Sequence, residues 1–205
     1  MNNSVEKTSV LDLLDGMQVK ETYEDGTLYE LTAAGRDGIG DAYCYQIYVP
    51  NSYDENTPVH AFMHGYTGQT REYRNDFEPF TNSLRNGIGE DSILILYDGF
   101  NAEPDGTTLN NLLEVSTYQP LEKLGISTEN IMFEGFSVGG KTALKLTAQH
   151  VINNPDLPPQ VIATYNPTCL HDVDAGLKES EIQALVDNHS TLIVFDGTED
   201  PETNG

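Results

Sequence analysis

A serine lies between glycines at the point where a strand pattern gives way to a helix pattern. Residues 135–140 read Gly-Phe-Ser-Val-Gly-Gly, and an apolar run at 131–133 precedes them. A serine hydroxyl can attack a carbonyl carbon when it projects from a tight strand-to-helix turn, and glycines two residues to either side leave room for that backbone. Ser137 is therefore the predicted nucleophile. The amide of Val138, at the start of the following helix, is a predicted donor to an oxyanion.

The segments on either side of the serine support this interpretation over a glycine-rich turn without chemistry. Residues 127–130 have the composition of a turn before a strand. The residues after Lys141 predict a helix, because apolar side chains recur there at helical spacing. That predicted buried face consists of Ala143, Leu144, Leu146, Ala148 and Val151.

A second motif follows another predicted buried strand. Residues 59–63 are mostly apolar, and residues 64–68 read His-Gly-Tyr-Thr-Gly. A tetrahedral intermediate needs two donors aimed at its developing negative charge. The backbone amide of Tyr66 is the predicted second donor beside Val138.

With these two motifs the chain resembles the α/β-hydrolase superfamily, especially secreted esterases of the polyhydroxyalkanoate-depolymerase, feruloyl-esterase and cutinase-like kinds. The resemblance covers residues 43–200. It implies an α/β fold with a doubly wound, mostly parallel sheet, and a serine esterase without a cofactor that acts on small-molecule or polymeric esters. It depends on four stretches: 45–50, 64–68, 125–131 and 195–200.

The resemblance also assigns the acid of a catalytic triad. In this family the acid follows a strand in the pattern Gly-x-x-Asp, which Asp200 matches after the predicted strand 191–195. Its role is to orient and stabilise an imidazolium. Asp196 and Glu199 are alternatives for that role, and an acidic turn without a catalytic role is the other interpretation.

The histidine of the triad is not where the family has it. The family order is serine, acid, histidine, and no histidine follows Asp200. His171 lies in a loop that leaves the active-site end of a predicted strand, so it is the possible substitute base. The other histidines are expected elsewhere: His60 inside a strand, His64 in the oxyanion motif, His150 at a helix end and His189 before a strand. We therefore expect a chain that lacks its C-terminal portion, with the last strand and helix, and that is nearly inactive alone.

Three functional classes fit these residues. The sequence favours an esterase-type serine hydrolase whose triad histidine is absent from these 205 residues. The alternatives are a peptidase or amidase on the same fold, and an inactive binding module in which the serine turn persists as fold geometry.

The composition of the chain limits the classes of partner that it can bind. The chain has 33 acidic and 10 basic residues and a net charge of -23, which argues against nucleic acid and anionic membrane surfaces. It contains no metal-binding motif of the common kinds, so we expect neither a metal nor a cofactor. No signal-peptide pattern or membrane-spanning run of about 18 apolar residues is present. Acidity and the resemblance favour a secreted or extracellular protein.

The elements that must position these residues alternate between strands and helices, which predicts one α/β domain over 1–205 with residues 1–8 disordered. The other expected elements are a helix at 10–14, strands at 17–22, 28–32, 43–49 and 92–97, a helical segment interrupted near Pro120, and a helix around 182–186. The apolar strand at 191–196 is expected at an uncovered sheet edge, where it pairs with a missing C-terminal segment or a second copy.

Overall fold

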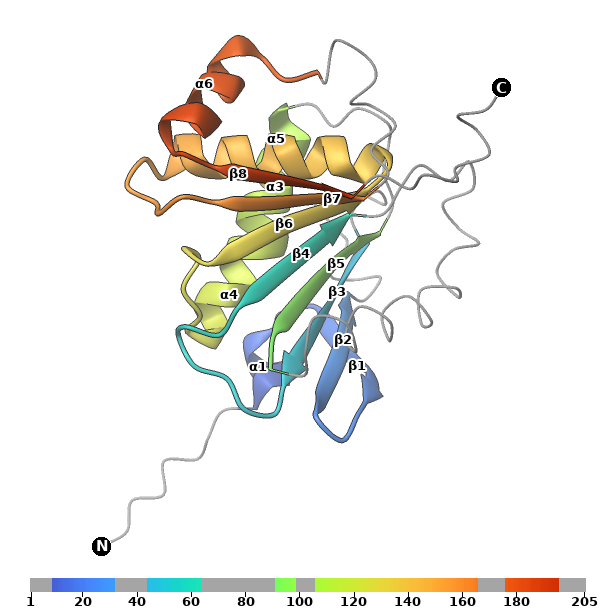
Figure 1. Cartoon of the computed structure of the whole chain (residues 1–205). Coiled ribbons are helices and arrows are strands. Elements are labelled where there is room, and N and C mark those ends of the chain that lie inside the picture. Colours follow the sequence, from blue (N-terminus) through green and yellow to red (C-terminus); the bar gives the residue numbers. More distant parts are fainter. Residues whose placement is uncertain (1–8, 32–43, 64–90, 99–105, 166–175, 196–205) are drawn as a thin grey trace, which may run out of the picture.

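The structure, a computed structural model, describes residues 9–31, 44–63, 91–98, 106–165 and 176–195. Its described strands form one sheet in the order β1-β2-β3-β5-β4-β6-β7-β8 (Figure 1). The five strands β4 to β8 run parallel to one another. The pairs β1–β2, β2–β3 and β3–β5 are antiparallel. The strands are β1 (Met17–Thr22), β2 (Gly26–Leu31), β3 (Cys44–Pro50), β4 (Val59–Met63), β5 (Ile93–Asp98), β6 (Ile131–Phe136), β7 (Val161–Tyr165) and β8 (Thr191–Phe195). The predicted α/β fold with a mostly parallel sheet is confirmed.

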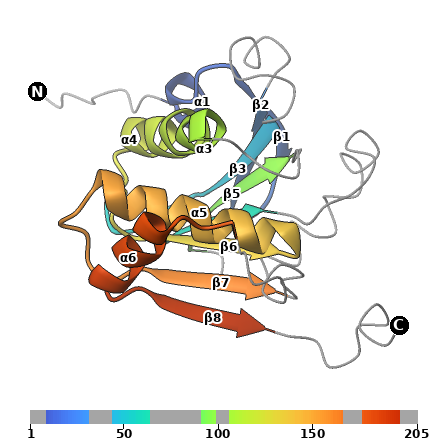
Figure 2. The ribbon, with the colours of Figure 1, turned by 90° about the horizontal axis from the view of Figure 1, so that it is seen from above.

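The larger described helices cover one face of this sheet, as Figure 2 shows for α3, α4, α5 and α6. The helical elements are α1 (Val10–Leu13), α3 (Gly106–Leu113), the π-helical turn η2 (Glu114–Tyr118), α4 (Gln119–Leu124), α5 (Val138–Asn153) and α6 (Glu179–Asp187). None of the described helices is long and apolar enough to cross a membrane.

The predicted elements form with small changes at their ends. The helix after the serine begins at Val138, three residues before the predicted start at Lys141. The predicted interruption near Pro120 is the π-helical turn η2, which ends at Tyr118. Pro120 lies in the first turn of α4, which continues η2 without a break. Because proline has no amide hydrogen, the regular helical hydrogen bond to the preceding turn cannot form there.

The core lies between the sheet and its helix-covered face. Side chains alternate between the two faces of a strand, so every second residue of β4, β5 and β6 enters this core. The predicted buried face of α5 packs against them, and all of its members are buried: Ala143, Leu144, Leu146, Ala148 and Val151. The central strands are apolar on both faces, as expected for parallel strands. Within these strands Glu134 on β6 and His60 on β4 interrupt that pattern, and Glu134 is buried.

Candidate active site

The backbone at Ser137 has a conformation that amino acids other than glycine rarely adopt. Its φ is 55° and its ψ is -121°, at the single residue between the end of β6 and the start of α5. Such strained positions persist when the surrounding structure holds them, and they occur preferentially at functional sites. The Ser137 amide donates to the carbonyl of Tyr165 at 2.9 Å, and the Gly140 amide donates to the Ser137 carbonyl at 3.0 Å. Neighbouring strand and helix backbone therefore fix the turn.

Two glycines beside Ser137, Gly135 and Gly140, lie against close neighbours. A Cβ atom added to Gly135 would lie 2.2 Å from the carbonyl carbon and oxygen of Gly139 and 2.5 Å from the Gly140 nitrogen. The end of β6 and the first turn of α5 thus touch through backbone atoms. A Cβ at Gly140 would lie 3.2 Å from the Cβ of Thr164 on β7. For Gly135 this geometry agrees with the predicted room-making role.

The carboxyl ends of the parallel strands meet at one edge of the sheet, which is where Ser137 lies. In the β4–β6 register Met63 pairs with Gly135. Phe136 pairs with Tyr165 on β7, and Tyr165 pairs in turn with Phe195 on β8. The strands that precede the predicted oxyanion and acid residues therefore end beside the serine turn. Tyr66 and Asp200 themselves lie outside the described residues, as do His64 and His171.

A partly buried polar cluster around the buried Glu134 lies on the sheet face opposite α5. One carboxylate oxygen of Glu134 is hydrogen-bonded to Nδ1 of His60 on β4, and the other accepts a hydrogen bond from the Tyr165 hydroxyl at 3.0 Å. Burial, the charge of Glu134 and this hydrogen bond raise the pKa of Tyr165 to about 12, so the hydroxyl keeps its proton and donates it. Because the Tyr165 carbonyl also accepts the Ser137 amide, the cluster ties β4, β6 and β7 together beside the serine turn.

Sequence reasoning missed this cluster, although a signal was present. Glu134 stands in the otherwise apolar strand Ile131–Phe136, and a buried charge in such a strand requires partners. Reasoning from the sequence also missed an aromatic row that follows the strand ends on the same face. The rings of Tyr165 and Phe195 stack with centroids 4.9 Å apart, and Phe136 is exposed beside them.

The described histidines do not lie at the serine turn. His60 is held by Glu134 within the sheet, and His189 precedes β8 at the opposite edge from Ser137. His150 lies in the last turn of α5, thirteen residues from Ser137 and therefore about 20 Å away along the helix axis. Its imidazole is buried between Tyr118 and Phe133. These placements agree with the prediction for all three residues.

The described residues hold no metal-site arrangement. No group of three or more His, Cys, Asp or Glu side chains in the described part of the chain is placed to bind a metal ion.

Comparison with known structures identifies the fold. No protein-family model matches the sequence, and no curated protein matches it either. The chain is similar to poly(aspartic acid) hydrolase-1 from Sphingomonas sp. KT-1, with a TM-score of 0.54 and 15% identity over 88% of this chain and 74% of that one. It therefore has the α/β-hydrolase fold.

Two esterase structures match over less of their own length. An acetyl xylan esterase from Aspergillus awamori has a TM-score of 0.45 and 18% identity over 70% of this chain and 54% of that one. A carboxyl esterase from Tuber melanosporum has a TM-score of 0.44 and 19% identity over 82% of this chain and 57% of that one. The chain thus spans little more than half the length of these two esterases.

Proposed function

We propose that the chain is a serine hydrolase that acts on carboxylic esters, with Ser137 as its nucleophile. The observation that supports this most is the strained backbone of Ser137 at the β6–α5 turn, at the carboxyl edge of an α/β-hydrolase sheet. Ligands in open α/β sheets bind outside the carboxyl ends of the strands. A strained serine at that edge, above a helix N-terminus, is the arrangement that nucleophilic acyl transfer needs.

In the proposed reaction the Ser137 Oγ attacks the ester carbonyl carbon and gives its proton to a histidine. The carbonyl oxygen becomes an oxyanion, which the amides of Val138 and Tyr66 stabilise. Collapse of the intermediate expels the alcohol, which takes the proton from the histidine, and leaves an acyl group on Ser137. Water then gives a proton to the histidine and attacks the acyl carbon. The carboxylic acid leaves, and Ser137 Oγ takes the proton back from the histidine. Asp200 would orient and stabilise the imidazolium, and Asp196 and Glu199 are its alternatives.

The general base in this proposal is a histidine that the described residues do not contain. His171, six residues after the end of β7, is the candidate within this sequence. Removing a triad member costs several powers of ten in rate. We therefore expect these 205 residues to hydrolyse activated esters slowly unless His171 acts as the base.

The test is hydrolysis of p-nitrophenyl acetate by the whole chain and by three variants. Ser137→Ala should remove whatever turnover exceeds the buffer rate, and Ser180→Ala, an exposed serine on α6, should leave it unchanged. If turnover is fast, His171→Ala should reduce it at least about a hundredfold. Turnover that survives Ser137→Ala would contradict the proposal.

A further inference from the structure

The buried carboxylate of Glu134 lies on β6, three residues before Ser137. The residue is 2% exposed, and in the described part of the chain its carboxylate bonds to His60 and Tyr165 alone. The cost of removing a carboxylate from water can exceed the free energy gained from its partners, and an apolar cluster of similar volume is often at least as stable. The stability of the sheet therefore does not explain why a carboxylate occupies this position.

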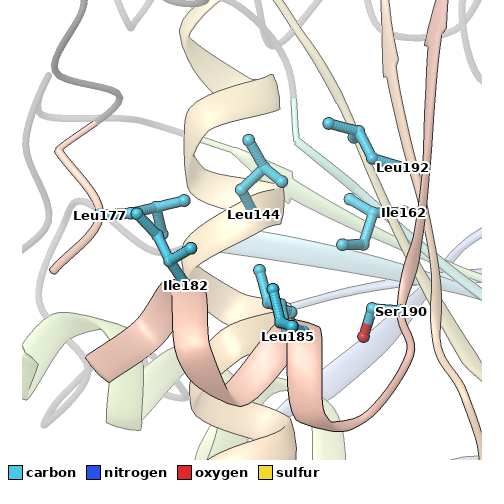
Figure 3. Close-up of a pocket in the computed structure, with 8 residues that line it drawn as sticks. Leu144, Ile162, Leu177, Ile182, Leu185, Ser190 and Leu192 are labelled. Carbon is cyan, nitrogen blue, oxygen red and sulfur yellow. The ribbon is translucent and has the colours of Figure 1, made fainter. Parts of the chain in front are cut away.

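A groove on the helix-covered face of the sheet offers no comparable group. The groove under α6 is open to solvent, has a volume of about 240 Å³ and lies between α5, α6, β7 and β8. Figure 3 shows its aliphatic walls, with Leu144 from α5, Leu185 from α6, and Ile162 and Leu192 from the two strands. No charged side chain is among the described residues that line it. The charged group nearest in sequence to the serine turn therefore lies on the other face, in the cluster around Glu134.

The cluster around Glu134 joins β4, β6 and β7. Strand β4 ends at Met63, directly before the predicted oxyanion motif at 64–68, and its His60 is hydrogen-bonded to one oxygen of Glu134. The other oxygen accepts a hydrogen bond from the Tyr165 hydroxyl at 3.0 Å. The carbonyl of Tyr165 in turn accepts the amide of Ser137 at 2.9 Å. One carboxylate is thus linked both to the strand before the oxyanion motif and to the backbone of the predicted nucleophile.

Packing around the carboxylate limits how far these strands can shift. Phe62 on β4 is buried and pairs with Glu134 in the β4–β6 register, and its ring centroid lies 6.4 Å from that of Tyr165. A buried polar network favours one arrangement of the groups that it joins, because other arrangements leave a charge unpaired. A shift of β4 against β6 would break the bond to His60, so the cluster fixes the relative position of the two strands.

We propose that Glu134 is a positioning residue of the proposed active site. Through its two partners it fixes the separation between Ser137 and the predicted oxyanion donor Tyr66. This inference deepens the proposed function and rests on it. Acyl transfer needs the serine Oγ and the oxyanion donors to converge on one carbonyl group, and a misplacement of about 1 Å can cost a factor of about 100 in rate. Glu134 acts only through other residues and does not touch the substrate.

The test replaces the cluster by apolar side chains of similar size. The apolar variant combines His60→Leu, Glu134→Leu and Tyr165→Phe. Because it leaves no polar group of the cluster without a partner, it should melt at or above the wild-type temperature. The matched control is Tyr118→Phe, which removes a buried hydroxyl that is bonded to His150 near the far end of α5. Circular dichroism checks that each variant is folded.

The first measurement is the rate at which an alkyl fluorophosphonate modifies Ser137, followed by peptide mass spectrometry. We expect this rate to be at least about tenfold below the wild-type rate in the apolar variant, because the Ser137 backbone and β4 are no longer held in register. Tyr118→Phe should react at the wild-type rate. A loss of rate at an unchanged melting temperature separates positioning from general stability.

The second measurement, hydrogen exchange of the Ser137 amide by NMR, does not depend on the reactivity of the serine. The internal reference is the amide of Ile93 at the start of β5, which donates to the carbonyl of Pro58 at 2.9 Å. The ratio of the two exchange rates, Ser137 to Ile93, should rise at least about fivefold in the apolar variant. It should stay unchanged in Tyr118→Phe.

In a stable apolar variant, either an unchanged exchange ratio or a wild-type rate of modification would overturn the proposal, because the cluster would then be structural only. If the apolar variant does not fold, Tyr165→Phe decides in the same way, with an expected change of about threefold in each measurement. A raised exchange ratio together with no adduct on Ser137 of the wild type would contradict the proposed function and would still support the positioning of Ser137 by Glu134.

Discussion

The β6–α5 turn and the end of strand β8 both lie at the carboxyl ends of the parallel strands of one sheet. Their surroundings nevertheless differ. At the turn, backbone atoms of Gly135 and Gly139 are in contact and neighbouring backbone groups hold Ser137 in a strained conformation. Along β8, by contrast, every residue is exposed, and α6 leaves an open groove beside it. The backbone of Ser137, the proposed nucleophile, is thus held by contacts on both sides, whereas β8, which precedes the predicted acid, pairs among the described strands with β7 alone.

This difference matters for the proposed reaction because preorganised groups contribute most to catalysis. Contacts on both sides of Ser137 hold its backbone, so its position depends little on the rest of the edge. Asp200 follows β8 by five residues in the sequence.

The largest expected effect is that of a substitution in the β6–α5 turn, the more tightly held of the two regions. Gly135→Ala places a Cβ 2.2 Å from backbone atoms of Gly139, which cannot rotate away. We expect a loss of more than about 3 kcal/mol in the free energy of unfolding, or failure to fold. Gly125→Ala is the matched control: its φ is +73°, but a Cβ there meets nothing within 4 Å, so it should cost about 1 kcal/mol. Equal losses by urea denaturation would contradict the account of the turn.

The next effect concerns the far end of α5, the helix that begins at the serine turn. Burial lowers the pKa of His150 to about 4, while the pKa of a histidine in an unfolded chain is about 6.5. The unfolded state therefore binds a proton first as the pH falls. Stability should be fully retained above pH 6.5 and should decrease by about 3 kcal/mol as the pH falls from 6.5 to 4.

The measurement is the free energy of unfolding against pH for the wild type and for His150→Phe. The variant lacks this titration, so the difference between the two curves should change over that pH range and be constant above it. A constant difference across the whole range would show that His150 is not held neutral by the helix packing.

The smallest expected effects concern two stacked aromatic residues, Tyr165 beside the serine turn and Phe195 on β8. Tyr165→Phe removes the hydroxyl that donates to the buried carboxylate of Glu134 and retains the carbonyl that accepts the Ser137 amide. It should cost about 1 to 2 kcal/mol. Phe195→Ala, on exposed β8, should cost less than about 1 kcal/mol. If thermal or urea unfolding reverses this order, β8 is the more tightly held region.

Much of the fold was predictable because the relevant signals are local. Continuous apolar runs marked the central strands, helical spacing marked α5, and glycines around Ser137 marked the turn between them. These features depend on the chain's own periodicity and on backbone conformations that few residues can adopt.

The remaining features depend on contacts between distant segments. The bond between His60 and Glu134 joins residues 74 positions apart, and no local pattern specifies which histidine meets the buried carboxylate. The groove under α6 likewise arises from the spacing between a helix and two strands. Tyr66, Asp200 and His171 remain predictions, because their loops lie outside the described residues.

The central claim is that Ser137 is the nucleophile, and its direct test is the site of covalent modification by an alkyl fluorophosphonate. Such a reagent transfers its phosphonyl group to a reactive serine Oγ and releases fluoride. After prolonged incubation of the whole chain, peptide mass spectrometry should find one adduct, on Ser137, and none in Ser137→Ala, while Ser180→Ala is modified like the wild type. An adduct on another residue, or an unmodified Ser137 in the folded chain, would contradict the claim.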